Sequence, residues 1–316
     1  MIELLDFKET DTVQASRLAQ ENFEEERGFV PALPKIAALP ELAYFAHNGN
    51  GCTAFEKRRM VGFLCFYPPI GDAYGTTGVK GTFSPIHAHG AVKENRSRIF
   101  SLLYQAVADR LVKDGILSHA VALYTHDAAA KDSFFQNGFG LRCVDAVRAL
   151  TPIEPVKAPQ FDFIEIPNEK KGMLIELHNL LITHLGSSPS FMPYPLKSEA
   201  EFASEKESAD IRYFAALIGG EAVAYIKIGD SGENFVCEYK EMVNICGACC
   251  LPDYRGTGLY HNLLSCVAKE LIKEGYTHLG VDFESFNPTA RGFWLKHFTA
   301  YTGGVVRRID DKMLRV

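Results

Sequence analysis

The chain repeats itself at a constant offset of 160 residues, and this repeat limits its fold more than any other feature. RIFSLLYQAVADRLVKDG occupies residues 98–115, and GLYHNLLSCVAKELIKEG occupies residues 258–275. Both segments place apolar residues four apart, which is typical of one face of a helix. The register continues without a gap as far as Asn287-Pro-Thr-Ala290, which aligns with Asp127-Ala-Ala-Ala130. The repeat therefore predicts a duplicated domain.

The seam between the two copies lies in TPIEPVKAPQ, residues 151–160, because its three prolines suit a linker. We expect one domain over residues 1–151 and a second over residues 160–316. Each copy reads as strand, helices, hairpin, strand, helix, strand, helix and strand, which predicts an α/β fold of the layered α+β kind. The clearest hairpin is IRYFAALIGGEAVAYIKIG, in which Gly219-Gly220 has the composition of a tight primed turn.

The overall composition excludes several classes of protein. With 47% hydrophobic and 23% charged residues, the chain is neither disordered nor fibrous. A net charge of −6 provides no basic field, so we expect neither nucleic acid nor a membrane surface as a partner. The first residues are acidic where a signal peptide would be basic and apolar, and the eight cysteines are scattered. These features predict a cytoplasmic protein with reduced thiols.

The segment CLPDYRGTGLYHNLL, residues 250–264, takes an apolar strand through two glycines directly into an amphipathic helix. Open N–H groups and the helix dipole at such a turn favour an anion, and the glycines permit close approach of a phosphate. The turn is not a Rossmann fingerprint, because His261 stands where the third glycine belongs. It is not a Walker A loop either, since no Lys-Ser/Thr pair follows.

LPDYRGTGL on a strand-to-helix turn, followed about thirty residues later by NPTARGFW, resembles the GNAT superfamily of N-acetyltransferases. The family's motifs are Gln/Arg-x-x-Gly-x-Gly/Ala and Asn-x-x-Ala with a following aromatic residue; Arg255, Gly258, Asn287 and Ala290 match them. The resemblance implies two tandem GNAT-like acyl-CoA N-acyltransferase domains, each with a mixed central sheet flanked by helices. It also implies acetyl-CoA as cosubstrate and no metal.

The resemblance further implies roles for individual residues. The backbone of Cys249 and Leu251 would pair with the pantetheine arm of the cofactor, and Asn287 would lie near that arm. The diphosphate would be held by the backbone of six consecutive residues: Arg255, Gly256, Thr257, Gly258, Leu259 and Tyr260. Asn287 followed by Pro288 is also typical of a helix cap, which is an alternative explanation for that asparagine.

Two positions depart from the family pattern. Tyr260 replaces the last Gly/Ala of the first motif, and Trp294 replaces the tyrosine that serves many members as general acid. Because an indole N–H is not an acid, Tyr301, Tyr260 or water would take that role, or the thiolate would leave without an acid. As general base we expect Glu241, ahead of the strand of the first motif. Two alternatives follow on the next strand, namely Asp282 and Glu284.

The first copy has lost the features of a cofactor loop. Asn95-Arg-Ser-Arg98 stands where the second copy has Arg255-Gly-Thr-Gly258, and the extra stretch IHAHGAV precedes the helix. We therefore expect this copy to be mainly structural. Alternatives are that SPIHAHG forms a different cofactor loop, or that His87 and His89 bind a metal.

These observations predict an N-acetyltransferase that acetylates a primary amine on a small molecule, an antibiotic or a protein. The alternative is a non-catalytic acyl-CoA-binding sensor, for which Trp294 is the motive. The resemblance also implies that the proline-rich segment SSPSFMPYP, residues 187–195, borders the acceptor site; the alternative is a packed, rigid connection between helices. A duplicated chain can act as its own pseudo-dimer, which favours a monomer over a homodimer.

Overall fold

The computed structural model of the protein describes residues 1–208 and 210–315. Two compact units are present: Met1–Asp145 together with Ala300–Val316, and Ala146–Thr299. The predicted division gave residues 300–316 to the second domain, whereas the structure groups them with the first. The reason is strand pairing, because this segment contains β13 (Thr299–Arg308), which pairs with β6 (Ile116–Tyr124) of the first unit.

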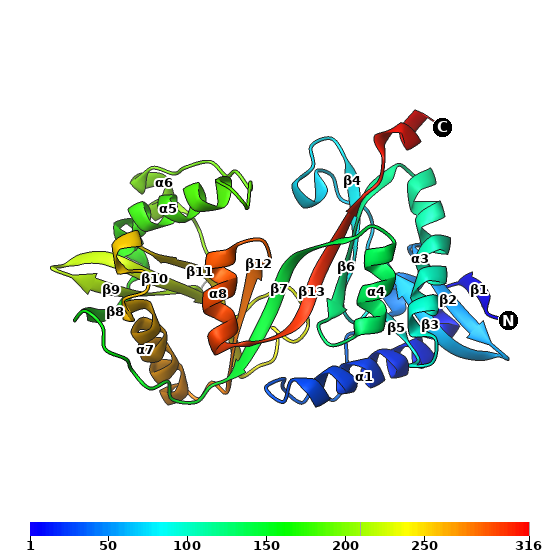
Figure 1. Ribbon diagram of the computed structural model, residues 1–316, viewed down its shortest axis with the longest axis horizontal. Helices are drawn as coiled ribbons and strands as arrows, with labels where there is room; N and C mark the ends of the chain where they lie inside the picture. Colours follow the sequence, from blue (N-terminus) through cyan, green and yellow to red (C-terminus); the bar gives the residue numbers. More distant parts are fainter. Residues whose placement is uncertain (209, 316) are drawn as a thin grey trace. The chain divides into compact units, whose positions relative to one another are not determined.

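The remaining elements of the first unit follow the chain from its N-terminus (Figure 1). Its other strands are β1 (Glu3–Asp6), β2 (Gly51–Glu56), β3 (Arg59–Cys65), β4 (Lys80–Ser84), β5 (His89–Ala91) and β7 (Gly140–Ala149), the last of which crosses the division. Its helices are α1 (Thr12–Phe29), α2 (Ala43–Ala46), α3 (Arg96–Lys113) and α4 (Ala128–Gln136), with 3-10 turns η1 (Glu9–Asp11), η2 (Ala73–Gly75) and η5 (Asp311–Arg315).

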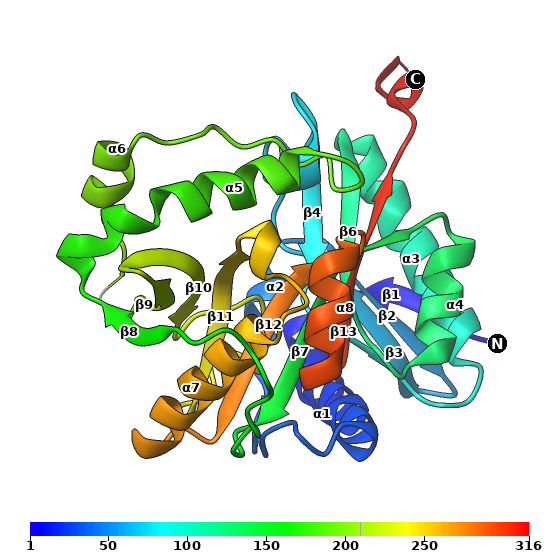
Figure 2. The same ribbon diagram turned by 60° about the vertical axis from the view of Figure 1, so that its left-hand side comes forward.

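The second unit contains the strands β8 (Asp162–Ile166), β9 (Arg212–Ile218), β10 (Glu221–Gly229), β11 (Met242–Cys250) and β12 (His278–Glu284). Its helices are α5 (Ile175–Gly186), α6 (Glu199–Ser204), α7 (Leu259–Lys273) and α8 (Pro288–His297), with 3-10 segments η3 (Asn168–Leu174) and η4 (Pro252–Tyr254). The sheet order is β12-β11-β10-β9-β8, antiparallel except for β11 and β12. Figures 1 and 2 show α5 and α7 on opposite faces of this sheet.

The repeat predicted from the sequence is confirmed at the level of elements. The residues predicted to form the apolar stripes of α3 and α7 are all buried: Ile99, Leu103, Val107 and Leu111 in the first copy, and Leu259, Leu263, Val267 and Leu271 in the second. The offset also places the start of α4, Ala128, on the start of α8, Pro288. A buried stripe at helical spacing fixes each helix against its sheet.

The predicted hairpin of the second unit is confirmed as β9 and β10. Gly219 and Gly220 join the two strands with φ of +61° and +89°, as a primed turn requires. On one face of the sheet, Tyr213, Tyr225 and Cys249 pack with apolar residues of η3, α5 and α6 into a core cluster. The α5 helix is thereby held over the C-terminal part of β11.

Candidate functional site

A cavity of about 450 Å³ opens beside the end of β11, within the second unit. Four elements contribute its walls: α5, β11 with the following loop, the start of α7, and α8. The lining residues are Leu181, His184, Ala248, Cys249, Cys250, Arg255, Gly256, Tyr260, Asn287, Thr289, Ala290, Gly292, Phe293, Trp294 and Lys296. Five of the nine predicted cofactor-binding residues are in this set, namely Cys249, Arg255, Gly256, Tyr260 and Asn287.

The two parallel strands beside the cavity separate halfway along their length. Pairing of β11 with β12 extends only from Met242 and His278 to Ile245 and Val281. A bulge follows at once, because the register of β11 with β10 shifts between Lys227 and Ile228. Beyond this point, the edge of β11 that faces β12 has no strand partner among the described residues. An extended ligand could pair with that edge as an additional strand.

The register of β11 decides which backbone groups face the gap. The N–H of Leu251 donates to the carbonyl of Val223 on β10, at 2.9 Å. Since hydrogen-bonded and non-hydrogen-bonded pairs alternate in an antiparallel ladder, Cys249 also faces β10. The groups that face the gap are those of Ala248 and Cys250. The backbone of Cys249 and Leu251, for which pairing with the pantetheine arm was predicted, therefore faces β10 rather than the gap.

The loop after β11 carries exposed backbone donors. The N–H groups of Gly256, Gly258, Tyr260 and His261 have no backbone partner among the described residues. They lie at the start of a 15-residue helix, whose dipole favours a negative charge. The Arg255 side chain is exposed and donates through Nε to the carbonyl of Cys250, at 3.0 Å. This end of the cavity therefore suits a phosphate.

The two glycines of the loop have different surroundings. A Cβ on Gly256 would meet nothing within 4 Å, and this residue lines the cavity. A Cβ on Gly258 would lie 2.8 Å from the carbonyl oxygen of Lys157 in the linker. The linker runs along α7, where Val156 donates to Asn262 Oδ1 at 2.8 Å. Gly258 thus admits the protein's own linker, while Gly256 is the open position.

Asn287 is a helix cap, as predicted, and it also lines the cavity. Its Oδ1 accepts from the N–H of Ala290 at 3.2 Å, which caps α8. The same oxygen lies 3.2 Å from Nε2 of His184 on α5. His184 was not among the sequence-predicted residues, because α5 is distant in sequence and only the fold brings the two together.

The opposite wall is aromatic. Tyr260, Phe293 and Trp294 contact one another edge to face, with ring centroids between 4.9 and 6.2 Å apart. The Tyr260 hydroxyl donates to the carbonyl of Tyr225 at 3.1 Å, and burial raises its pKa well above the usual range. Such a hydroxyl is a poor proton donor for a leaving group. Burial also raises the pKa of the Cys249 and Cys250 thiols to about 11.

The two residues predicted to be catalytic lie outside the cavity lining. Glu241 is exposed at the opposite end of β11, where its carboxylate accepts from Tyr239 at 3.3 Å. Nine residues along an extended strand separate it from Cys250, or about 30 Å. Tyr301 is fully buried on β13 of the first unit. The alternatives Asp282 and Glu284 do not line the cavity either.

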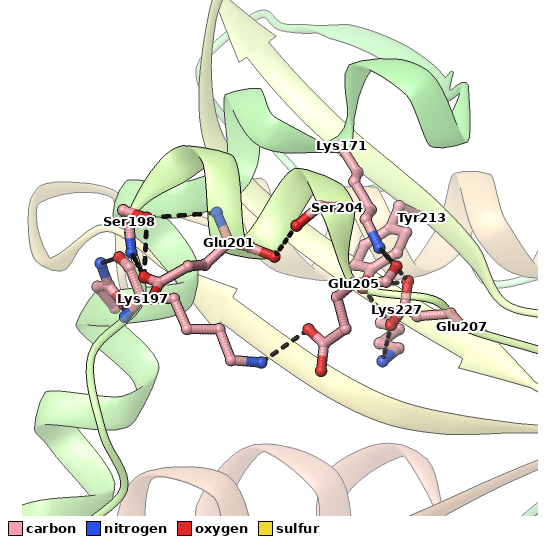
Figure 3. A network of polar contacts seen from close by, with 10 residues as sticks. Lys171, Lys197, Ser198, Glu201, Ser204, Glu205, Glu207, Tyr213 and Lys227 are labelled. Atoms are coloured by element: carbon pink, nitrogen blue, oxygen red, sulfur yellow. Dashed lines mark hydrogen bonds and ion pairs between the residues drawn. The ribbon is translucent and has the colours of Figure 1, made fainter.

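A separate polar network lies on the sheet face that α5 covers (Figure 3). The Glu207 carboxylate accepts from Lys227 at 2.5 Å, from Tyr213 at 2.8 Å and from Lys171 at 3.2 Å. Burial alone would raise the pKa of Glu207, but the hydrogen bonds from Lys227 and Tyr213 outweigh it and lower the pKa. None of these residues lines the cavity, so the network ties η3 and the segment after α6 to the sheet.

The corresponding place in the first unit is occupied by the protein's own ion pairs. Arg96, which aligns with Gly256, bonds to Glu25 at 2.9 Å and to Asp127 at 3.0 Å. Asp127 aligns with Asn287 and caps α4 as Asn287 caps α8. A cavity of about 350 Å³ adjoins these carboxylates. The carboxylates of this cavity would repel a diphosphate, and the Arg96 side chain occupies the position that corresponds to the open Gly256.

The stretch SPIHAHG is buried rather than presented as a loop. It separates β4 from β5, and His89 Nε2 lies 2.6 Å from the carbonyl of Ala122. Burial lowers the pKa of both His87 and His89 to about 4. Within residues 1–208 and 210–315, no three His, Cys, Asp or Glu side chains gather closely enough to hold a metal ion. In the same part of the chain, no helix has the length and apolar character to cross a membrane.

Residues 178–298 match the model of the acetyltransferase (GNAT) family. This segment is a GNAT domain. It contains the whole cavity and every sequence-predicted site residue except Tyr301. The family resemblance of the second copy is therefore confirmed, and it supports an N-acyltransferase that uses acyl-CoA.

Solved structures extend the likeness to the whole chain. A GCN5-related N-acetyltransferase from Sphaerobacter thermophilus is 11% identical with a TM-score of 0.58, over 99% of this chain and 98% of its own. A glucosamine N-acetyltransferase region of a fungal multi-domain β-N-acetylglucosaminidase is 12% identical with a TM-score of 0.50, over 97% of this chain and 38% of that one. At these identities the likeness concerns the fold, and it confirms the predicted GNAT fold class. No curated protein matches the sequence.

Proposed function

We propose that the protein transfers an acetyl group from acetyl-CoA to a primary amine of an acceptor, and that the GNAT domain performs the chemistry. The observation that carries this proposal is the unpaired edge of β11, which leads directly to the exposed N–H groups at the start of α7. The edge suits an extended amide-containing arm, and the helix start suits a diphosphate. The two lie in the order in which coenzyme A carries these groups.

The proposal assigns a role to each part of the site. Gly256 and the following N–H groups hold the diphosphate, with Arg255 adding a positive charge. Ala248 and Cys250 pair with the pantetheine arm, which brings the thioester to the point where β11 and β12 separate. A backbone N–H in that gap polarises the thioester carbonyl and stabilises the oxyanion that forms on attack.

Departure of coenzyme A does not require Tyr260 or Trp294 as an acid. A thiol has an ordinary pKa of about 8.5, so its anion is a tolerable leaving group near neutral pH. This accounts for a site in which the tyrosine of the family motif is Trp294 and the remaining Tyr260 hydroxyl is committed to Tyr225.

We further propose that the acceptor is a small molecule or a protein amino group, that the enzyme is cytoplasmic, and that it acts as a monomer without nucleic acid or membrane. The net charge of −6 favours the approach of a cationic acceptor to the protein, although the charged side chains of the cavity itself are Arg255 and Lys296. The segment after α5 exposes Phe191 and Tyr194, with 69% and 50% of their surface accessible, which suits an acceptor with an apolar portion.

The test combines binding with turnover. Isothermal titration with acetyl-CoA measures cofactor affinity, and thiol release is followed against a panel of primary amines. Binding with amine-dependent thiol release is the expected result. Gly256→Asp places a carboxylate in the open position of the loop and should weaken acetyl-CoA binding at least tenfold, whereas Gly28→Asp on the exposed end of α1 should not.

The second candidate is a non-catalytic acyl-CoA sensor. It is favoured by one observation, that the tyrosine of the family motif is Trp294 here and that the hydroxyl of Tyr260, the aromatic residue in contact with it, is buried and bonded to Tyr225. Tight acetyl-CoA binding without thiol release on any amine would support the sensor and reject the enzyme. Absence of any binding would reject both.

A further inference from the structure

The cavity raises the question of which group removes the proton from the acceptor's ammonium. Six lining residues carry a titratable side chain: His184, Cys249, Cys250, Arg255, Tyr260 and Lys296. The two thiols and Tyr260 have raised pKa values and cannot accept a proton from an ammonium while they are protonated. Arg255 and Lys296 are cations. The remaining candidate is His184.

Asn287 determines how the His184 ring presents its two nitrogens. Because Asn287 Oδ1 accepts the N–H of Ala290 at 3.2 Å, it is the amide oxygen that faces His184. Nε2 of His184 must then be the protonated nitrogen, since an oxygen cannot donate to it. The neutral ring keeps its lone pair on Nδ1, which has no hydrogen-bond partner in the described part of the chain. Imidazole is also the side chain that most often acts as a general base in enzymes.

We propose that His184 is the general base of the transfer and that Asn287 is its positioning residue. This inference rests on the proposed function of the same cavity. Nδ1 takes one proton from the acceptor ammonium, and the released lone pair forms the C–N bond to the thioester carbon. The C–S bond then breaks, the new amide nitrogen gives up its second proton, and the coenzyme A thiolate takes it. The proton on His184 passes to solvent, so one proton is released for each acetyl group transferred.

The charged groups that share the cavity are Arg255 from the loop after β11 and Lys296 from α8. Both are cations, and Cys249 and Cys250 are neutral thiols at physiological pH because their pKa is about 11. No carboxylate lines the cavity among the described residues. The described lining therefore contains no acidic side chain that could replace His184 as a base.

The experiment compares wild type with His184→Gln, in which the amide can still donate to Asn287. His178→Gln is the matched control, because His178 lies on the same helix, stacks on Phe202 and does not line the cavity. The kcat/KM for acetyl transfer to the best primary amine of the panel is measured from pH 6 to 10, with acetyl-CoA affinity by calorimetry. We expect a 10²- to 10⁴-fold loss of kcat/KM at pH 7 for His184→Gln. Affinity should stay within twofold, and His178→Gln should resemble wild type.

The pH profile separates a base from a structural residue. The deficit of His184→Gln should shrink as the pH approaches about 10, because the amine then loses its proton without help. His184→Ala should regain activity when imidazole is added. A kcat/KM within threefold of wild type would overturn the inference and leave the proposed function intact. A deficit that is constant with pH and not rescued by imidazole would also overturn it. Acetyl-CoA binding without transfer by wild type would overturn both.

Discussion

At the scale of single residues, the two glycines of the cofactor loop show that one motif can serve two purposes. Both have positive φ, +76° at Gly256 and +88° at Gly258, where a side chain is strained. Only Gly258 is also crowded, by the carbonyl of Lys157 at 2.8 Å from a Cβ. The sequence motif predicted close approach of a phosphate at both. It could not reveal the linker, because that contact joins segments 101 residues apart.

We therefore expect Gly258→Ala to destabilise the second unit more than Gly256→Ala. Each substitution strains the backbone by about 1–3 kcal/mol, and Gly258→Ala adds an overlap with backbone that cannot rotate away. The free energy of unfolding, measured in urea, should differ between the two variants by at least about 1 kcal/mol. Equal decreases in the free energy of unfolding would mean that the linker moves away from the added methyl group at no cost. The two glycines would then not differ in their structural role.

The site residues divide according to how local their signals are. Arg255, Gly256 and Asn287 were predictable because they lie within two short motifs that the chain largely retains. His184 was not, since nothing in the sequence of α5 marks one histidine among apolar neighbours. Glu241 was chosen for its position before a strand, but the strand directs it to the end remote from the loop. A carboxylate near a motif in sequence need not be near it in space.

At the scale of elements, the first copy differs from the second in two ways. One strand is divided into two, and the loop before the long helix carries Arg96 in place of a glycine. In the second unit, β11 pairs with β10 on one side and with β12 on the other. In the first unit these two roles are divided, because β5 pairs with β3 while β4 pairs with β6. The buried SPIHAHG stretch joins the two pieces. The sequence indicated an extra stretch here, but the division of one strand into two depends on long-range pairing.

The ion pairs of Arg96 at this loop lead to a prediction for its stability. Its guanidinium is 7% exposed and neutralises Glu25 and Asp127, so Arg96→Gln should cost about 3 kcal/mol in the free energy of unfolding. Arg17→Gln, which removes a pair with Glu21 on an exposed arginine, should cost less than about 1 kcal/mol. Chemical denaturation measures both. Acetyl-CoA affinity should be unchanged in Arg96→Gln. Binding of a second acetyl-CoA molecule to that variant would contradict the conclusion that the cavity of the first unit does not suit a diphosphate.

The buried histidines of the first unit predict acid lability. Burial lowers the pKa of His87, His89 and His119 to about 4, from an ordinary value of 6.5. Below pH 6.5 the histidines of the unfolded chain bind protons while the buried rings do not. The stabilisation is therefore fully present above pH 6.5 and is lost as the pH falls toward 4. Each histidine contributes on the order of 3 kcal/mol to this loss.

Calorimetric melts at several pH values between 7.5 and 4.5 test this expectation. The transition temperature should fall steadily across the range, and His89→Gln should fall less steeply. The glutamine amide can still donate to the Ala122 carbonyl but takes up no proton. A transition temperature that is independent of pH between 6.5 and 4.5 would show that the folded and unfolded chains bind equal numbers of protons, and would contradict the lowered pKa of these rings.

At the scale of the whole molecule, the duplication and the fold class were predictable, but the boundary of the first unit was not. Helical stripes and turn motifs repeat at a fixed offset, so they reveal the two copies. The pairing of β13 with β6 is a long-range event, and it leaves no local mark on residues 299–308. A proline-rich linker suggested that the first domain ends at 151. The structure instead completes the first unit with the last strand of the chain.

This topology predicts that residues 1–151 do not fold alone. Without β13, the register from Thr302 and Tyr124 to Arg308 and Ser118 is lost, and an edge of β6 is left open beside the core. Tyr301 and Val305, both buried, are missing as well. Fusing residues 299–316 to residues 1–151 through a flexible linker of about 20 residues should restore a cooperative transition, because such a linker spans about 25 Å.

Thermal melts followed by circular dichroism, with size-exclusion chromatography, compare the two proteins. Residues 1–151 alone should aggregate or melt without cooperativity, and the fusion should be monomeric with a single sharp transition. As a matched control, a fusion carrying Val305→Asp and Tyr301→Asp in the added strand should behave like residues 1–151. Cooperative folding of residues 1–151 without the strand would show that β13 is dispensable, and the boundary predicted from the sequence would then stand.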